Sequence, residues 1–236
     1  CALPISFGAL LSGHFAAAAG RKKIILVLAV IFAMGALGTS MAPDVAWMIF
    51  FRLVLGVAVG GAAATVPVYI AEIAPANRRG QLVTLQELMI VSGQMLAYIS
   101  NAGFNAAWGG ETTWRWMLAV ATLPAVLLWF GMMFMPDTPR WYAMKGRLAE
   151  ARRVLERTRR KDDVEWELME ITETLDEQRN LGKPKIREIM TPWLFKLFMI
   201  GIGVAVIQQL TGVNTIMYYA PTVLTSVGMT DNAALF

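Results

Sequence analysis

Uncharged polar side chains gather in the middle of an apolar stretch near the end of the chain. Residues 197–230 contain no Asp, Glu, Lys, Arg or His, yet Gln208, Gln209, Asn214 and Tyr218 lie inside that stretch. Amides and phenols both donate and accept hydrogen bonds, as recognition of a neutral solute with many hydroxyl groups requires. An anion would need Arg or Lys, and the stretch has neither. We therefore expect these residues to line a binding cavity for a sugar-like solute.

The same stretch carries two residues that weaken a helix. Gly212 lies between the glutamines and Asn214, and Pro221 follows further along. Glycine permits a local break, and proline removes a backbone hydrogen bond. A broken helix that presents amides at mid-membrane depth is typical of solute-binding transporters. The pattern thus predicts a membrane helix over 194–227 that is interrupted near Gly212.

A second set of polar residues follows one side of a helix. From Glu87, the steps to Gln94, Tyr98, Asn101 and Asn105 are seven, four, three and four, which keeps all five on one face. Polar groups left unbonded in lipid cost several kcal/mol each, so this stripe faces protein or water. Hydrogen bonding between helices is one explanation. A solute pathway, favoured by the carboxylate of Glu87, is the other.

Arg52 is a third polar group inside an apolar run. A charge within a membrane span usually faces a partner or a water-filled cavity. A buried functional pairing is the interpretation we favour. The alternative is extension of the side chain to the nearer membrane surface, because Arg52 lies near the start of its run. No acidic residue of this chain is an obvious partner.

The apolar runs indicate the elements that hold these groups. Of the 236 residues, 56% are hydrophobic and 16% are charged, whereas soluble domains are about 25% charged. A membrane helix needs roughly 20 mostly apolar residues, and several runs reach that length. We therefore predict an all-α membrane protein. Its expected membrane helices are 2–19, 24–42, 45–73, 80–105, 115–135 and 194–227.

The positive charges are distributed as a chain that crosses a membrane repeatedly requires. Lys and Arg concentrate in 21–23, 78–79 and 140–196, whereas the alternate connections, 43–44 and 104–113, have none. An excess of Lys and Arg marks the cytoplasmic side. This pattern accounts for the net charge of +4 and the pI near 9.4 without a nucleic-acid partner. With one Cys and one His, we expect no internal disulfide, metal site or cofactor.

Small residues predict close helix packing in one span. Gly56 and Gly60 lie four apart in "GVAVGGAAA", with Gly61 and Ala64 nearby. Small residues at that spacing let membrane helices approach closely.

Residues 137–190 differ from the spans because they are highly charged and are typical of soluble helices. One apolar helical stripe runs along the second half of this segment, formed by Val164, Leu168, Ile171 and Leu175. A plain linker is possible, but the stripe favours docking against the membrane domain.

Four motifs follow one another along the chain: "RLVLGVAVGG", "PVYIAEIAPANRRG", "PDTPRWYAMKGR" and "QQLTGVNTIMYYAP". In this order and spacing they resemble motifs of the sugar porter family of the major facilitator superfamily. They correspond there to the start of helix four, the connection to helix five, the segment after helix six, and helix seven. The resemblance implies a major facilitator fold. This chain, interpreted as a fragment, would cover about helix 2 to helix 7, with an N-terminal bundle over 1–136, a cytoplasmic helical segment over 137–190 and the start of the C-terminal bundle over 191–236.

The resemblance also implies roles for the polar residues of the last span. Gln208, Gln209 and Asn214 match residues that bind sugar hydroxyls, and Tyr218 lies beside them. Tyr219 matches the extracellular gate region.

Charged residues acquire roles by the same route. Arg52 matches the arginine that, in proton-coupled members, pairs with an acid on helix one, which lies outside this chain. Ala17 and Ala18 stand where the family usually has Asp and Arg, so part of its cytoplasmic charge lock differs here. The charges expected to lock that face when the protein opens outward are Arg21, Glu72, Arg79 and Arg140.

Glu87 departs from the family pattern. It stands where glucose and xylose porters usually carry a sugar-binding Gln. The run "ELMIVSGQ", which ends at Gln94, looks more like that of bacterial myo-inositol–proton symporters. A carboxylate accepts stronger hydrogen bonds than an amide. Glu87 would therefore select a differently arranged polyol or take part in proton coupling, and we place it with Gln94 among the substrate-binding residues.

We therefore expect a secondary transporter, not an enzyme, that is monomeric and multi-pass in the bacterial cytoplasmic (inner) membrane. It would carry protons together with a neutral polyol or sugar by alternating access, with myo-inositol first and a hexose or pentose second. A facilitative uniporter, a transporter-like solute sensor and a truncated inactive product are the alternatives.

Overall fold

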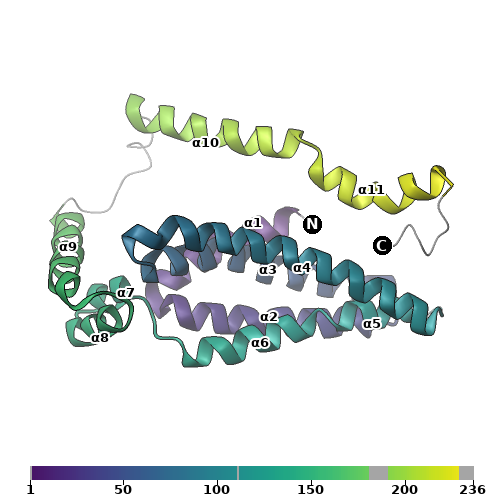
Figure 1. Cartoon of the computed structure of the whole chain (residues 1–236), viewed down its shortest axis with the longest axis horizontal. Helices are drawn as coiled ribbons and strands as arrows, with labels where there is room; N and C mark the ends of the chain where they lie inside the picture. Colours follow the sequence, from purple (N-terminus) through teal and green to yellow (C-terminus); the bar gives the residue numbers. More distant parts are fainter. Residues whose placement is uncertain (1, 111, 181–190, 229–236) are drawn as a thin grey trace. The chain divides into compact units, whose positions relative to one another are not determined.

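The computed structural model describes residues 2–110, 112–180 and 191–228, and the regular secondary structure within them is helical (Figure 1). The chain divides into two compact units, Cys1–Glu173 and Thr174–Phe236. The all-α prediction is confirmed. The expected division into 1–136, 137–190 and 191–236 stays a prediction.

The helices that match the expected spans begin and end within a few residues of the predicted bounds. Those of the first unit are α1 (Ala2–Ala19), α2 (Arg21–Ser40), α3 (Val45–Ile73), α4 (Arg79–Trp108, preceded by the short 3-10 helix η1, Ala76–Arg78), α5 (Thr113–Ala119) and α6 (Thr122–Phe134). The second unit holds α10 (Pro192–Leu210) and α11 (Val213–Ser226). Among the residues that the structure describes, five stretches are long and apolar enough to cross a membrane: Arg21–Ser40, Val45–Ile73, Ala76–Trp108, Thr113–Phe134 and Pro192–Tyr219.

One expected span is two helices. The sequence predicts a continuous helix over 115–135, whereas the structure ends α5 at Ala119 and begins α6 at Thr122. Pro124 explains the difference, because it has no N–H to donate to the carbonyl of Val120. Instead, the N–H of Leu123 bonds that carbonyl at 3.1 Å, in a tighter turn.

Helix α3 is the centre of the first unit and packs against α1 and α2, while α2 packs against α5 and α6. Glycine makes the α1–α3 contact close. A Cβ on Gly60 would lie 1.9 Å from the carbonyl oxygen of Ile5, and one on Gly8 would lie 2.2 Å from that of Val57. The two backbones thus approach too closely for any side chain between them, which confirms the small-residue prediction.

Three helices of the charged segment follow α6. They are α7 (Pro139–Met144), α8 (Leu148–Thr158) and α9 (Lys161–Asn180), the last of which extends past the boundary between the two units. Leu155 of α8 and Val164 of α9 are buried. The guanidinium of Arg147 hydrogen-bonds Glu150 and lowers the pKa of that carboxyl. This pair is exposed at the start of α8 and contributes little to stability.

Candidate functional site

The predicted break near Gly212 is present. Helix α10 ends at Leu210, α11 begins at Val213, and Gly212 between them has a φ of 71°. That left-handed backbone favours glycine, because a Cβ would be strained there. The hydroxyl of Thr211 donates to the carbonyl of Gln208 at 2.6 Å, and the N–H of Gly212 donates to that of Gln209 at 3.2 Å. The backbone carbonyls of both glutamines, at the end of α10, are therefore hydrogen-bonded by the two residues that follow the helix.

The polar residues of this unit are placed on both sides of the break. Gln208 and Gln209 occupy the last turn of α10, and both are exposed within their unit. Tyr218 and Tyr219 lie on α11 and are also exposed. Asn214 belongs to α11, but its side chain lies outside the described part of the structure. The exposed amides and phenols can bond a solute with many hydroxyl groups.

The predicted stripe from Glu87 to Asn105 lies on one unbroken helix. Helix α4 runs from Arg79 to Trp108, so the regular spacing keeps the polar positions on one face. Glu87 and Gln94 are exposed, as expected of groups that face a solute path or another part of the protein. The stripe belongs to the first unit, whereas the break at Gly212 belongs to the second.

Arg52 lies in the second turn of α3, and its side chain is exposed. Within residues 2–110, 112–180 and 191–228 it makes no ion pair. The functional pairing that we favoured for this arginine therefore has no acidic partner in the described part of the chain.

Charged groups meet at one end of the first unit, where α1 and α3 end and α2 begins. We call this the charged end. Nη2 of Arg21 donates to Oε1 of Glu72 at 2.9 Å, and both side chains are largely buried. Arg21 also donates through Nη1 to the carbonyl of Ala16 at 3.3 Å. Oε2 of Glu72 is buried and has no hydrogen-bond partner in the described structure.

Asp137 fixes the start of α2 at the charged end. Its Oδ1 accepts the N–H groups of Arg21 at 3.1 Å and Thr138 at 2.9 Å. Oδ2 fills the space beside Gly20, where a Cβ would lie only 2.1 Å away. Gly20 has a φ of 102°, which favours glycine as well. The negative carboxylate thus caps the positive end of the helix dipole of α2.

The other expected lock residues have different contacts. Nε of Arg79 donates to the carbonyl of Ala71 in the last turn of α3, at 3.1 Å. The side chain of Arg140, in α7, makes no hydrogen bond or ion pair with the described residues. Sequence reasoning missed two residues of the charged end: Asp137 and Arg159, whose guanidinium donates to the carbonyls of Ile73 and Ala74 at the end of α3. Asp137 lies in the quoted motif "PDTPR", which was a usable signal, whereas Arg159 lies in a run of similar basic residues.

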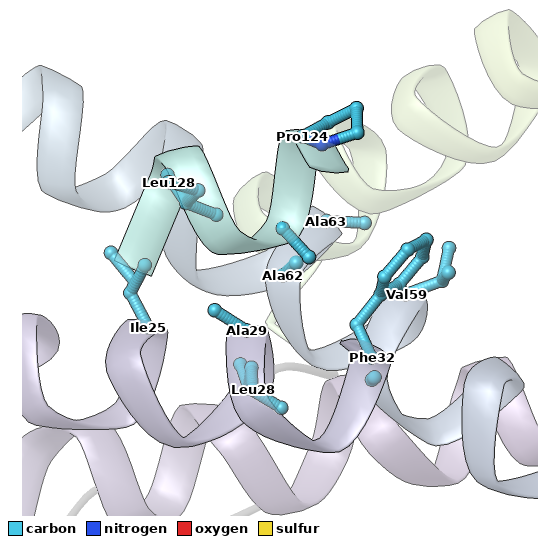
Figure 2. Close-up of a pocket in the computed structure, with 11 residues that line it drawn as sticks. Ile25, Leu28, Ala29, Phe32, Val59, Ala62, Ala63, Pro124 and Leu128 are labelled. Atoms are coloured by element: carbon cyan, nitrogen blue, oxygen red, sulfur yellow. The ribbon is translucent and has the colours of Figure 1, made fainter. Parts of the chain in front are cut away.

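A cavity of about 360 Å³ lies between α2, α3 and α6 (Figure 2). Figure 2 shows Ile25 and Phe32 of α2 facing Val59 of α3 and Leu128 of α6. Every residue that lines it is Ala, Val, Leu, Ile, Phe or Pro. A polyol bound there would lose its hydrogen bonds to water without replacement, so this cavity is unsuited to such a solute.

The family described as "Sugar (and other) transporter" matches residues 2–236. The chain belongs to the sugar transporter family. It spans about half the length of the curated relatives it matches. The major myo-inositol transporter IolT of Bacillus subtilis is 45% identical over 231 residues, which is 98% of this chain and 49% of IolT. A D-xylose transporter of Levilactobacillus brevis is 40% identical over 97% of this chain and 49% of that protein.

Solved structures agree with this family assignment. The proton:xylose symporter XylE of E. coli, bound to 6-bromo-6-deoxy-D-glucose, matches 99% of this chain and 53% of XylE. The TM-score is 0.87 and the sequence identity is 28%. The chain therefore has part of a major facilitator fold, and the proteins it resembles are membrane transporters, not enzymes.

Proposed function

We propose that the full-length protein is a proton-coupled symporter for a neutral polyol or sugar in the bacterial cytoplasmic membrane. The observation that carries this proposal is the break at Gly212, with Gln208 and Gln209 exposed beside it inside an apolar stretch of membrane length. Interrupted helices of this kind bind solutes in transporters. Gln208, Gln209, Asn214 and Tyr218 would bond hydroxyl groups, and Tyr219 would close the outer side.

We assign myo-inositol as the first candidate substrate, with a hexose or pentose second. Glu87 supports this order, because its carboxylate only accepts hydrogen bonds and accepts them strongly. A ring that presents a hydroxyl group at every carbon offers such an acceptor many donors. The similarity to the myo-inositol transporter IolT points the same way. Gln94, seven residues further on the same face of α4, would share the solute.

Proton coupling is proposed from Arg52 and from the similarity to a proton:xylose symporter. An arginine in a membrane span usually faces a partner or a water-filled cavity, and Arg52, which is exposed on α3, makes no ion pair among the described residues. In the full-length protein, an acidic residue from another helix would pair with Arg52. Protonation of that acid would release Arg52 and connect the proton to the movement of α3.

The charged end suits a lock that opens and closes during alternating access. The ion pair between Arg21 and Glu72 joins α2 to α3. Oε2 of Glu72 is buried without a bond, so it is available to a further cation. We propose that Arg79 and Arg140 belong to this lock on the cytoplasmic face, and that the protein works as a monomer.

The deciding experiment is uptake of labelled myo-inositol by the full-length protein in proteoliposomes, with and without an inward proton gradient. Gradient-driven uptake that excess glucose or xylose does not displace supports the proposal. Uptake that ignores the gradient indicates a uniporter. Glucose or xylose uptake without inositol uptake keeps the transport class and rejects the substrate.

Two variants test the site itself. Glu87→Gln should shift selectivity towards glucose and xylose or weaken proton coupling. Glu150→Gln removes the same charge from an exposed position on α8 and is the matched control. Asn214→Ala should raise the apparent KM for solute while the protein still folds. Wild-type uptake by both site variants would remove α4 and α11 from the proposed cavity.

A further inference from the structure

Arg159 caps a helix that precedes it by 86 residues. It follows α8 directly, and its N–H donates to the carbonyl of Leu155 at 2.7 Å. Its guanidinium donates through Nη1 to the carbonyl of Ile73 at 2.6 Å and through Nη2 to that of Ala74 at 3.0 Å. These carbonyls close α3 and have no partner within that helix. A positive charge there also complements the helix dipole.

Glu167 holds this guanidinium in place. It lies on α9, and its two oxygens accept from Nε and Nη2 of Arg159, at 2.5 and 2.7 Å. The side chain of Arg159 is only 4% exposed. An arginine bound at two points by a carboxylate has a fixed plane, which a lysine does not reproduce. The ends of α3 and α8 and the first half of α9 are therefore joined through one side chain.

The end of α3 that Arg159 holds also carries half of the lock. Glu72 immediately precedes Ile73 and bonds Arg21 of α2. On the other side of that ion pair, Asp137 binds the backbone of Arg21 from the connection that leads into α7. The segment that contains α7, α8 and α9 thus contacts both sides of the ion pair: Asp137 at its start binds the backbone of Arg21, and Arg159 between α8 and α9 binds the carbonyls that follow Glu72.

We propose that Arg159 is a positioning residue for the lock. By fixing the last turn of α3 it places Glu72 within reach of Arg21, so helices α7–α9 form a clamp across the charged end. Its consequence for transport rests on the proposed function: a weaker clamp lets this end open more readily, which changes the turnover number more than the KM for solute.

Hydrogen exchange of the full-length protein in lipid nanodiscs tests the clamp without any solute. In Arg159→Gln we expect exchange in 70–79 to rise roughly tenfold, as loss of hydrogen bonds to a charged group predicts. Exchange at the start of α2, in 21–26, should rise as well. Arg157→Gln, two residues away on α8, removes the same charge from an exposed arginine and should change neither segment.

A Glu72→Gln variant shows whether Arg159 acts on the start of α2 through the ion pair or only caps α3. In Glu72→Gln the start of α2 should already exchange faster, and adding Arg159→Gln should raise it no further. If Arg159→Gln does not fold, Glu167→Gln replaces it in the test. This variant keeps the arginine, and exchange in both segments should rise by a smaller factor. A rise confined to 70–79, or no rise in either segment, overturns the proposal even where the protein transports inositol. If exchange rises in both segments as expected but the wild-type protein transports no solute, the proposed function is wrong and the clamp stands.

Discussion

Replacing Gly20 by alanine should open the charged end and lower the stability of the folded protein. A residue with a side chain at this φ of 102° and ψ of 147° is strained by about 1–3 kcal/mol. The new methyl group would lie 2.1 Å from Oδ2 of Asp137, so the carboxylate must move away from the start of α2. Losing one hydrogen bond to a charged acceptor costs about 1.5–3 kcal/mol. Together these terms predict a loss of roughly 2.5–6 kcal/mol.

Thermal unfolding of the full-length protein, followed by tryptophan fluorescence, measures this loss. At about 2–4 °C per kcal/mol for 150–250 residues, the unfolding temperature should fall by roughly 5–24 °C, and by less in a longer chain. Trp141 is a built-in reporter, because its Cε2 lies 3.2 Å from the position of the new Cβ. Gly13→Ala is the control, since a Cβ there meets nothing within 4 Å. Equal unfolding temperatures for Gly20→Ala and Gly13→Ala would refute the argument.

Three further predictions follow from contacts described above. Gly60→Ala should separate α1 from α3, because its Cβ would lie 1.9 Å from a backbone oxygen. The yield of monodisperse protein in size-exclusion chromatography should drop, and a wild-type yield would contradict the close packing. Arg21→Gln should cost about 3–5 kcal/mol, since it leaves Glu72 buried without its cation. Adding Glu72→Gln should restore part of that stability in thermal unfolding, and full additivity of the two losses would contradict the ion pair. Gly212→Ala should cost about 1–3 kcal/mol through its φ of 71° and reduce solute uptake, whereas unchanged uptake would show that the break is dispensable.

Features that depend on nearby residues were predictable from the sequence. The spans follow from the length of the apolar runs, and the break at Gly212 follows from one glycine among polar residues. The close contact of Gly60 follows from its spacing to Gly56. The break before α6 was missed, although Pro124 supplies its cause. A proline near the start of an apolar run is compatible with a straight helix, so composition alone did not decide between one continuous helix and two.

Contacts between residues far apart in the chain were not predictable. Arg159 is one of several arginines around α8, and only the fold brings it to the carbonyls of Ile73 and Ala74. Asp137 belongs to a motif that the sequence analysis used, but its position over Gly20 depends on how α6 returns to the start of α2. For Arg52, the sequence offers no obvious acidic partner, and the described residues contain no ion pair with it.

The capping of α2 by Asp137 also has a consequence for biosynthesis. Asp137 is made 116 residues after Arg21, which at about 5–20 residues per second is a delay of roughly 6–23 s. During that interval the start of α2 has no carboxylate cap, and α2 and α3 are both synthesised before Asp137 is made. Helices α1, α2 and α3 therefore leave the ribosome before the cap on α2 can form. A mutation that removes the carboxylate of Asp137 would leave the start of α2 uncapped after synthesis is complete, and destabilised proteins are degraded more readily in cells.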